Sequence, residues 1–547
     1  MLIRKKPPRP HALGEPILHD NHPLPVTRRD FVAAGLLSGP AMVIGPAWLG
    51  GLLKASRADA ALSADIQALL DKTQCNVPTA SGSLPFICFD LAGGANLVGS
   101  EVLVGVQGGQ RNFLSTAGYG KLGVPGNMVP SSSADIDASL GLLWHADGAI
   151  KRGILSKATT AATAAGTNGA VLCAMSQNDT QNNPHNPMYG IAAAGAQGLL
   201  LTLIGTESSV SGGNSQAPMA LINPALQPTT ISQPSDSTSL VPMPPGGGAQ
   251  DPLAVAVLES QVRISGGNAT QAGAGDTAAF TGTLSMPNGA TPGVQLYGSD
   301  PNATAAMDAA LKNQVRCAYV KSAHTADKFG DPAALDPTKD TNITGGASPI
   351  FTASDFSDSD VAKTATVMKL VLNGFAGAGT ITLGGYDYHD GTRATGEDRN
   401  FKAGQMIGAV LEYAQRLKTP VMIYVFSDGS LTSTGMVDNS AGGRGKLGWQ
   451  GDNASVASTF FLAYSPAGRP QLRNGAAGQQ IGYFSSDGSV VSTSSPAANA
   501  VNQLVQVVIL NYMGLIGTDG QFPTLFPTQS LGSAGALAGL TAFTRIV

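Results

Sequence analysis

Charged side chains are scarce in this 547-residue chain, and their scarcity excludes one class of function. Asp, Glu, Lys and Arg make up 12% of the residues, with 32 basic against 36 acidic side chains. Affinity for nucleic acids comes largely from Lys and Arg side chains that neutralise phosphates. A chain with so few basic residues and a net negative charge is therefore not expected to bind nucleic acid.

Cysteine is also rare, which limits the disulfide and metal chemistry that the chain can carry. The four cysteines are Cys75, Cys88, Cys173 and Cys317, too few and too scattered for a disulfide scaffold or a zinc cluster. Cys88 and Cys173 lie in apolar runs, so we expect both to be buried thiols. A disulfide between Cys75 and Cys317 would require an oxidising compartment, and nothing in their spacing favours it.

The first 60 residues have the features of a twin-arginine export signal. A basic opening leads to the pair Arg28 and Arg29, and residues 31–53 then contain no charged side chain. Glycine and proline interrupt this stretch, so it is a weak match to the roughly 20 strongly apolar residues of a spanning helix. A signal needs only about 7 to 15 apolar residues before a small-residue cleavage site, which residues 58–60 (Ala-Asp-Ala) supply.

We therefore expect the twin-arginine translocase to export the chain. The mature protein would begin near Ala61, would not be embedded in a membrane, and would lie in the periplasm or outside the cell. An uncleaved N-terminal membrane anchor is the alternative, because Lys54 and Arg57 also suit the flank of a membrane segment. Without residues 1–60 the chain keeps 24 basic and 32 acidic side chains, so the mature protein is the more acidic form.

Apolar runs that alternate with helical patterns predict an α/β fold, a three-layer sandwich with a mostly parallel central sheet. Its first part is expected at residues 61–205, where short apolar runs are typical of strands buried on both faces. Residues 206–350 are rich in Gly, Ser, Thr and Pro and are interpreted as a long irregular insertion. Whether this insertion is a lid, a partner surface or only long loops stays open. The second part of the core is expected at residues 351–547.

Several predicted strands end in acidic residues. The apolar run 84–89 leads to Asp90, a strand over 380–383 leads to residues 384–389 (Gly-Gly-Tyr-Asp-Tyr-His), and the run 421–426 leads to Ser-Asp-Gly. Ligand sites in open parallel sheets lie just beyond the carboxyl ends of the strands. These acidic residues are therefore expected to share one edge of the sheet.

Two helices are predicted beside these strands from their end signals. Asp360 is expected to cap the first helix, and Gly374 to end it. The second is expected over about 496–513, with Ser495 as its cap, proline in its first turn and Gly514 beyond its end.

In order along the chain, these motifs resemble an exported bacterial family known as domain of unknown function 1501. That family carries the strings Gly-Gly-Trp-Asp-Thr-His, Ser-Glu-Phe-Gly and Asp-His-Gly, and residues 91–97 partly match its glycine-rich loop after an early strand. The likeness spans most of residues 84–205 and 355–515. The family in turn resembles the alkaline phosphatase and sulfatase superfamily, in which carboxylates and histidines at strand ends hold two divalent metals beside a Ser or Thr nucleophile.

The resemblance implies a metal site built from five residues. Asp387 and His389 match the Asp and His of the first string. Asp428 matches the Glu of the second string, and Asp452 the Asp of the third. Asp90 would be the first-strand ligand of the wider superfamily. Two cations held in this way clamp the attacking and leaving oxygens of phosphoryl or sulfuryl transfer.

Departures from the family pattern change the expected metal. Asn453 stands where the family has His, and Gly429 follows Asp428 where phosphatases have a second His. Only four histidines follow residue 60, so a His-rich Zn²⁺ site is harder to assemble than an oxygen-rich Mg²⁺, Mn²⁺ or Ca²⁺ site.

Four further residues are candidates for the same cleft. Ser100, in the loop after Asp90, is the candidate nucleophile, and Asn96, His185 and Asn453 are candidates for lining the cleft. Each candidate also has a structural interpretation, as a cap, a turn residue or a satisfied loop side chain.

Two functions of different class follow from the sequence. The first is a metal-dependent hydrolase of phosphate or sulfate esters that works outside the cytoplasm. The second is a catalytically inactive secreted protein with a binding, assembly or structural role on the same fold, which the missing histidines and sparse charge favour. Clustering of the five predicted ligands would support the first function, and their dispersal the second.

Overall fold

The computed structural model describes residues 84–130, 133–176, 183–240 and 332–547. All of these residues belong to one of two units into which the chain divides. The twin-arginine pair Arg28 and Arg29 lies outside the described residues, as do Cys75 and Cys317 of the conceivable disulfide. Those predictions therefore stay predictions.

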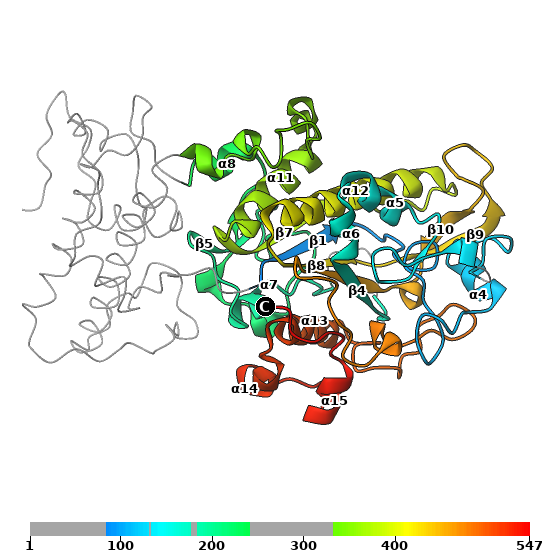
Figure 1. The fold of residues 1–547 in the computed structure, drawn as a ribbon. Helices are drawn as coiled ribbons and strands as arrows, with labels where there is room; N and C mark the ends of the chain where they lie inside the picture. Colours follow the sequence, from blue (N-terminus) through cyan, green and yellow to red (C-terminus); the bar gives the residue numbers. More distant parts are fainter. Residues whose placement is uncertain (1–83, 131–132, 177–182, 241–331) are drawn as a thin grey trace, which may run out of the picture. The chain divides into compact units, whose positions relative to one another are not determined.

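An eight-stranded, mostly parallel sheet forms the centre of this unit (Figure 1). The strand order is β12-β4-β11-β8-β1-β7-β5-β6, and only β11 runs antiparallel to its neighbours. The strands are β1 (Phe86–Leu91), β4 (Thr167–Leu172), β5 (Leu201–Gly205), β6 (Thr229–Thr230), β7 (Ala376–Leu383), β8 (Val421–Ser427), β11 (Thr459–Tyr464) and β12 (Gln480–Ile481). The carboxyl ends of the parallel strands therefore meet at one edge of the sheet, together with the amino end of β11.

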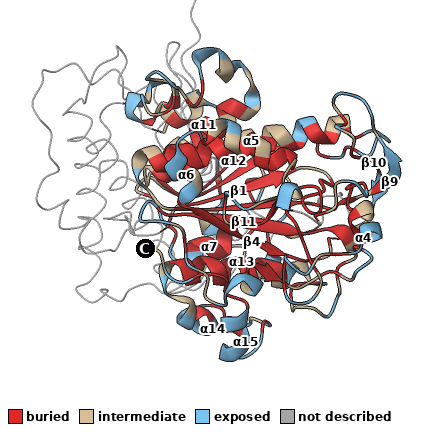
Figure 2. Ribbon diagram, turned by 45° about the vertical axis from the view of Figure 1, so that its right-hand side comes forward, coloured by how far each residue is buried: buried red, intermediate tan, exposed pale blue. Residues whose placement is uncertain are grey.

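Helices cover both faces of the sheet, which gives three layers (Figures 1 and 2). On one face lie α5 (Ala149–Lys157), α11 (Ser359–Leu372) and α12 (Ala394–Leu417), and on the other α7 (Met188–Ala193) and α13 (Val501–Ile516). The side chains of β1 explain this arrangement, because successive side chains of a strand point to opposite faces. Ile87 and Phe89 enter the first core, whereas Phe86 and Cys88 enter the second.

Small residues bring α12 close to α5, and this contact fixes the helix that follows the predicted Asp387 and His389 motif. A Cβ on Gly404 would lie 2.1 Å from the carbonyl oxygen of Ile150, and one on Gly153 would lie 2.1 Å from that of Phe401. A larger side chain at either position would separate the two helices.

Three helix ends differ from the sequence prediction. Asp358, not Asp360, caps α11, because the Asp358 side chain accepts a hydrogen bond from the Asp360 amide. The predicted start of α13 near residue 496 is wrong, since Ala500 is extended (φ −152°, ψ 99°) and the helix begins at Val501. Its end is also later than predicted, at Ile516.

The coarse fold prediction is confirmed: the sheet is mostly parallel and carries helices on both faces. Part of the predicted insertion, however, belongs to the α/β body. β6 pairs with β5, and Ile231, Leu335 and Ile343 are buried in the same core as α11.

Two narrower observations complete the fold. The predicted burial of Cys88 and Cys173 is confirmed. Among the described residues, no helix combines the length and the apolar character needed to cross a bilayer.

Candidate functional site

Three of the five predicted ligands meet at the carboxyl edge of the sheet. Asp387 and His389 follow β7, and Asp452 ends β10 (Leu447–Asp452), shortly before β11. One potential ligand atom from each residue lies within 4.8 Å of the others. His389 Nε2 is 2.7 Å from Asp387 Oδ1, and the two side chains are 41% and 47% exposed. We call Asp387, His389 and Asp452 the exposed triad.

Two tyrosines hold the loop that carries Asp387 and His389. The Tyr386 hydroxyl donates to the carbonyl oxygen of Arg399 at 2.9 Å. The Tyr388 hydroxyl donates to Asn400 Oδ1 at 3.1 Å. Both rings are buried, whereas the alternate residues of the loop are exposed. The sequence Tyr-Asp-Tyr-His thus anchors the loop through its aromatic residues and leaves the Asp and His side chains on the outside.

The glycine loop after β1 lies directly against the triad. Gly93 has φ +125°, and a Cβ on it would lie 2.4 Å from the Asp387 amide nitrogen. A Cβ on Gly94 would lie 3.4 Å from Asp452 Oδ1. The loop therefore approaches both aspartates at a distance that glycine permits.

Backbone hydrogen bonds tie β10, the strand that ends at Asp452, to the residues that follow His389. The Gly391 amide donates to the Trp449 carbonyl oxygen, and the Trp449 amide donates to that of Thr392, both at 2.9 Å. Asn453, which follows Asp452, accepts the Ser455 amide at 3.0 Å through its side chain and so caps a short 3₁₀ helix. Asn453 thus has a local structural role next to the triad.

Asp90 does not join the triad. It lies within β1, fully buried, and its carboxylate accepts hydrogen bonds from the Ser215 amide at 2.7 Å and the Ser215 hydroxyl at 3.2 Å. A Cβ on Gly213 would lie 2.8 Å from Asp90 Oδ2, so this loop covers the carboxylate. Burial raises the pKa of Asp90 to about 7, against the lowering effect of its hydrogen bonds, and the charge of Asp428 raises it further.

Asp428 and His185 belong to a second, buried polar cluster. Asn183 Nδ2 lies 2.6 Å from Asp428 Oδ1 and 3.1 Å from Ser176 Oγ. Ser176 Oγ also accepts the Gly429 amide at 3.0 Å and lies 2.9 Å from His185 Nε2. Because a hydroxyl has one proton and two acceptor sites, Ser176 donates to His185 Nε2. Burial lowers the pKa of His185 to about 3, so this imidazole is neutral at ordinary pH.

Ser100 lies in a buried charged network rather than at the triad. The Arg393 guanidinium donates to Ser100 Oγ at 2.8 Å and to Glu397 Oε1 at 2.9 Å. Lys446 Nζ is 2.8 Å from the same Glu397 oxygen. Burial raises the pKa of Glu101, next to Ser100, to about 7, although Lys446 and Arg393 lower it. The hydroxyl of Ser100 is therefore an internal hydrogen-bond acceptor.

Asn96 has a structural role as well. Its side-chain amide donates to the Leu431 carbonyl oxygen at 3.2 Å, and its backbone amide donates to the Tyr388 hydroxyl at 3.0 Å. Sequence reasoning missed this role of Asn96 and the buried network around Arg393. The spacing of Arg393 and Glu397, four residues apart at a helix start, was the one signal in the sequence for that network.

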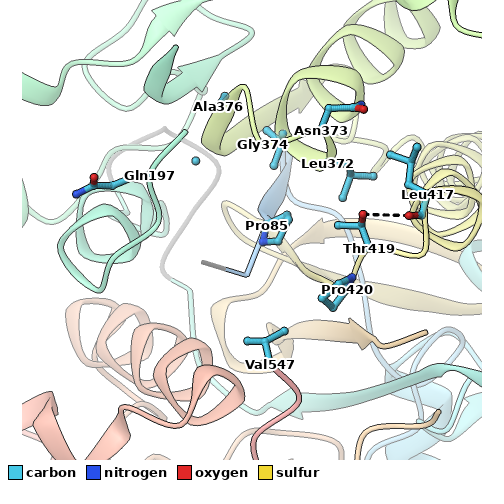
Figure 3. A pocket seen from close by; sticks show the side chains of 12 residues that line it. Pro85, Gln197, Leu372, Asn373, Gly374, Ala376, Leu417, Thr419, Pro420 and Val547 are labelled. Atoms are coloured by element: carbon cyan, nitrogen blue, oxygen red, sulfur yellow. Dashed lines mark hydrogen bonds between the residues drawn. The ribbon is translucent and has the colours of Figure 1, made fainter. Parts of the chain in front are cut away.

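A cavity lies at the opposite edge of the sheet, near the amino ends of β1 and β7 (Figure 3). Its volume is about 520 Å³. None of its lining side chains ionises; they include Pro85, Gln197, Asn373, Leu417 and Thr419. This cavity cannot supply an acid, a base or a charged metal ligand from those side chains.

The exposed triad fits a divalent cation. Two carboxylates match the charge of the ion. Carboxylates suit Mg²⁺, Ca²⁺ and Mn²⁺, and Zn²⁺ takes both imidazole and carboxylate ligands. Two ligands of one ion are at most twice the metal–ligand distance apart, about 4.2 Å for Mg²⁺ and about 5 Å for Ca²⁺. The observed limit of 4.8 Å therefore requires only small side-chain movements. Three protein ligands leave coordination positions for water or a substrate.

Comparisons with protein families, curated proteins and solved structures gave no match to this chain. Its function is therefore inferred from the geometry of these residues.

Proposed function

We propose that the exposed triad binds a divalent metal ion and that the protein is a metal-dependent hydrolase of phosphate or sulfate esters. The observation that carries this proposal is the meeting of Asp387, His389 and Asp452 within 4.8 Å. These residues come from chain segments more than 60 positions apart, and all three are exposed to solvent. A bound divalent cation supplies charge neutralisation to the ester oxygens and activates water at neutral pH.

The side chains of the site have separate tasks in this proposal. Asp387 and Asp452 provide the negative charge that retains the cation, and His389 provides a neutral nitrogen ligand. Asp387 and His389 already contact each other at 2.7 Å, so one orients the other before the cation binds. Ser100 is buried and bonded to Arg393, and we therefore assign the attack on the ester to water.

The proposal includes the wider resemblance to the alkaline phosphatase and sulfatase superfamily. The mostly parallel sheet and the position of the triad beyond its carboxyl ends support it. In this proposal the twin-arginine translocase exports the chain to the periplasm or beyond.

A binding or assembly protein without turnover is the second candidate. The observation that favours it is the internal use of Asp90 and Asp428, which the superfamily would employ as ligands. Ser215 contacts the Asp90 carboxylate, and Asn183 that of Asp428. A site with one cation in place of two would then serve for recognition alone.

The test is hydrolysis of p-nitrophenyl phosphate and p-nitrophenyl sulfate by the exported protein, with and without added Mn²⁺, Mg²⁺, Ca²⁺ or Zn²⁺. We expect metal-dependent turnover that falls by more than about 100-fold in Asp452→Asn and His389→Gln, since even outer-shell partners of a metal typically contribute 10- to 100-fold. Asp398→Asn is the matched control, because Asp398 is an exposed aspartate on α12 outside the triad. Metal-loaded protein that hydrolyses neither ester would favour the second candidate.

A further inference from the structure

Three cationic side chains of α11 and α12 are unequally partnered. Lys363 Nζ lies 3.1 Å from Glu207, and Lys402 Nζ lies 2.9 Å from Asp358 and 2.8 Å from Asp360. Arg399, by contrast, is exposed, and its guanidinium makes no ion pair or hydrogen bond with any part of the chain that the structure describes. Arg399 is therefore a positive charge available to an anion from solution.

The guanidinium of Arg399 rests on the loop that leads to the triad. A Cβ on Gly385 would lie 3.0 Å from Arg399 Cζ, 3.1 Å from Nη2 and 3.2 Å from Nε. All three atoms are equally close, so the planar group lies flat against the glycine. Gly385 precedes Asp387 by two residues, which span at most about 7 Å of chain.

A second contact ties Arg399 to the same loop. The Tyr386 hydroxyl donates to the backbone carbonyl oxygen of Arg399 at 2.9 Å, and Tyr386 directly precedes Asp387. The positions of the arginine and of the aspartate are thus linked through one buried tyrosine. Movement of α12 relative to the loop would break this hydrogen bond.

We propose that Arg399 is the anion-recognition residue of this site and binds the terminal phosphate or sulfate group of the substrate. This proposal rests on the proposed function and narrows it to esters that carry a free anionic group. A guanidinium offers parallel N–H donors that match two oxygens of a phosphate or sulfate group. In the metal-loaded site the two carboxylates balance the charge of the ion, so a nearby cationic side chain adds the positive charge that attracts the anion.

The ligand chemistry follows from this pairing. A guanidinium binds two oxygens of a phosphate or sulfate group and leaves the remaining oxygens for the metal ion. A neutral carboxylic ester or an amide lacks the oxygens that the guanidinium would bind. The site therefore selects monoesters with a terminal anion over uncharged esters.

The test is calorimetric titration of inorganic phosphate, and separately of sulfate, into Mn²⁺-loaded full-length protein. Arg399→Ala is expected to weaken phosphate binding by about tenfold or more, the low end of what a charge-assisted hydrogen bond contributes, while Mn²⁺ affinity stays within about twofold. Arg399→Lys is expected to retain part of the affinity for phosphate. The lysine ammonium keeps the positive charge but lacks the paired N–H donors of the guanidinium. Arg111→Ala, a change at another exposed arginine, leaves phosphate binding unchanged.

Three results would overturn the assignment of Arg399, and only the last of them would also refute the proposed function. Equal phosphate affinity in metal-loaded wild-type protein and Arg399→Ala would refute the role of Arg399 while the metal site stands. A parallel loss of Mn²⁺ affinity in Arg399→Ala would show a structural role for the arginine instead. Wild-type protein that binds no divalent metal would refute both proposals together.

Discussion

At the scale of single residues, the polar side chains of the carboxyl edge fall into two groups. Asp387, His389 and Asp452 are exposed and face one another, whereas Asp90 and Asp428 are buried and accept hydrogen bonds from neighbouring loops. Solvent can exchange with a ligand only at the first group. Of the five predicted ligands, three therefore form a solvent-accessible candidate site, and two make internal hydrogen bonds.

The closeness of Asp387 and His389 follows from the sequence, whereas the internal hydrogen bonds of Asp90 and Asp428 do not, for a physical reason. Asp387 and His389 are two residues apart, so their proximity follows from local geometry. The partner of Asp90 is Ser215, which is 125 residues away. No local pattern specifies that a loop closes over the end of β1, and an acid after an apolar run is equally consistent with a ligand or an anchor.

Asp90 makes a testable contribution to the pH dependence of stability. Its pKa is about 7 in the folded protein against an ordinary value of 3.8, so between about pH 4 and pH 7 the folded state holds a proton that the unfolded chain has released. The contribution of Asp90 to the free energy of unfolding therefore falls as the pH rises through that window, by up to about 1.4 kcal/mol per pH unit. The contribution is complete below about pH 4 and lost above about pH 7.

The check is urea denaturation of wild-type protein and Asp90→Asn, in EDTA, at several pH values from 4.5 to 7.5. The stability of the wild-type protein relative to the variant is expected to decrease as the pH rises to about 7 and then to level off. A difference that does not depend on pH would contradict the account of Asp90 as a buried acid that keeps its proton.

At the scale of elements, the triad depends on three segments that approach closely. The loop after β1 passes under Asp387 and Asp452, the loop after β7 carries Asp387 and His389, and β10 presents Asp452. The predicted apolar runs located β1 and β8 to within two residues. The antiparallel direction of β11 had no signal in its sequence, because an apolar run reads the same in either direction.

The close approach of Gly93 gives a prediction about the loop after β1. Gly93→Ala is expected to destabilise the protein by about 2–4 kcal/mol, since its φ is +125° and its Cβ would lie 2.4 Å from the Asp387 amide nitrogen. Gly195→Ala is the matched control, because Gly195 has φ +107° and nothing within 4 Å of its Cβ position. The control should lose only about 1 kcal/mol, the low end of the cost of a strained backbone conformation.

Thermal or urea unfolding measures both glycine variants, and a metal titration adds a second readout. Gly93→Ala should also weaken metal binding, because the new methyl group displaces the backbone of Asp387, whereas Gly195→Ala should not. Equal losses of stability in the two variants would show that the contact between the two loops has little energetic weight.

At the scale of the whole molecule, the described chain is a three-layer α/β unit with its candidate site where the parallel strands end. Composition and periodicity predicted this architecture, since strands buried on both faces require apolar runs and covering helices. They did not predict that residues 229–230 add a strand at the edge of the sheet. A two-residue pairing leaves no hydrophobic pattern, and the sequence around it is rich in Ser, Thr and Pro.

The most direct test of the account is the metal stoichiometry of the full-length protein. Elemental mass spectrometry after equilibrium dialysis against Mn²⁺ would compare three proteins. They are the wild-type protein, a triple variant that combines Asp387→Asn, His389→Gln and Asp452→Asn, and the control Asp398→Asn. The account predicts close to one ion per chain in the wild-type protein and the control, and almost none in the triple variant. Wild-type protein without bound metal, or a triple variant that retains it, would contradict a metal site at Asp387, His389 and Asp452.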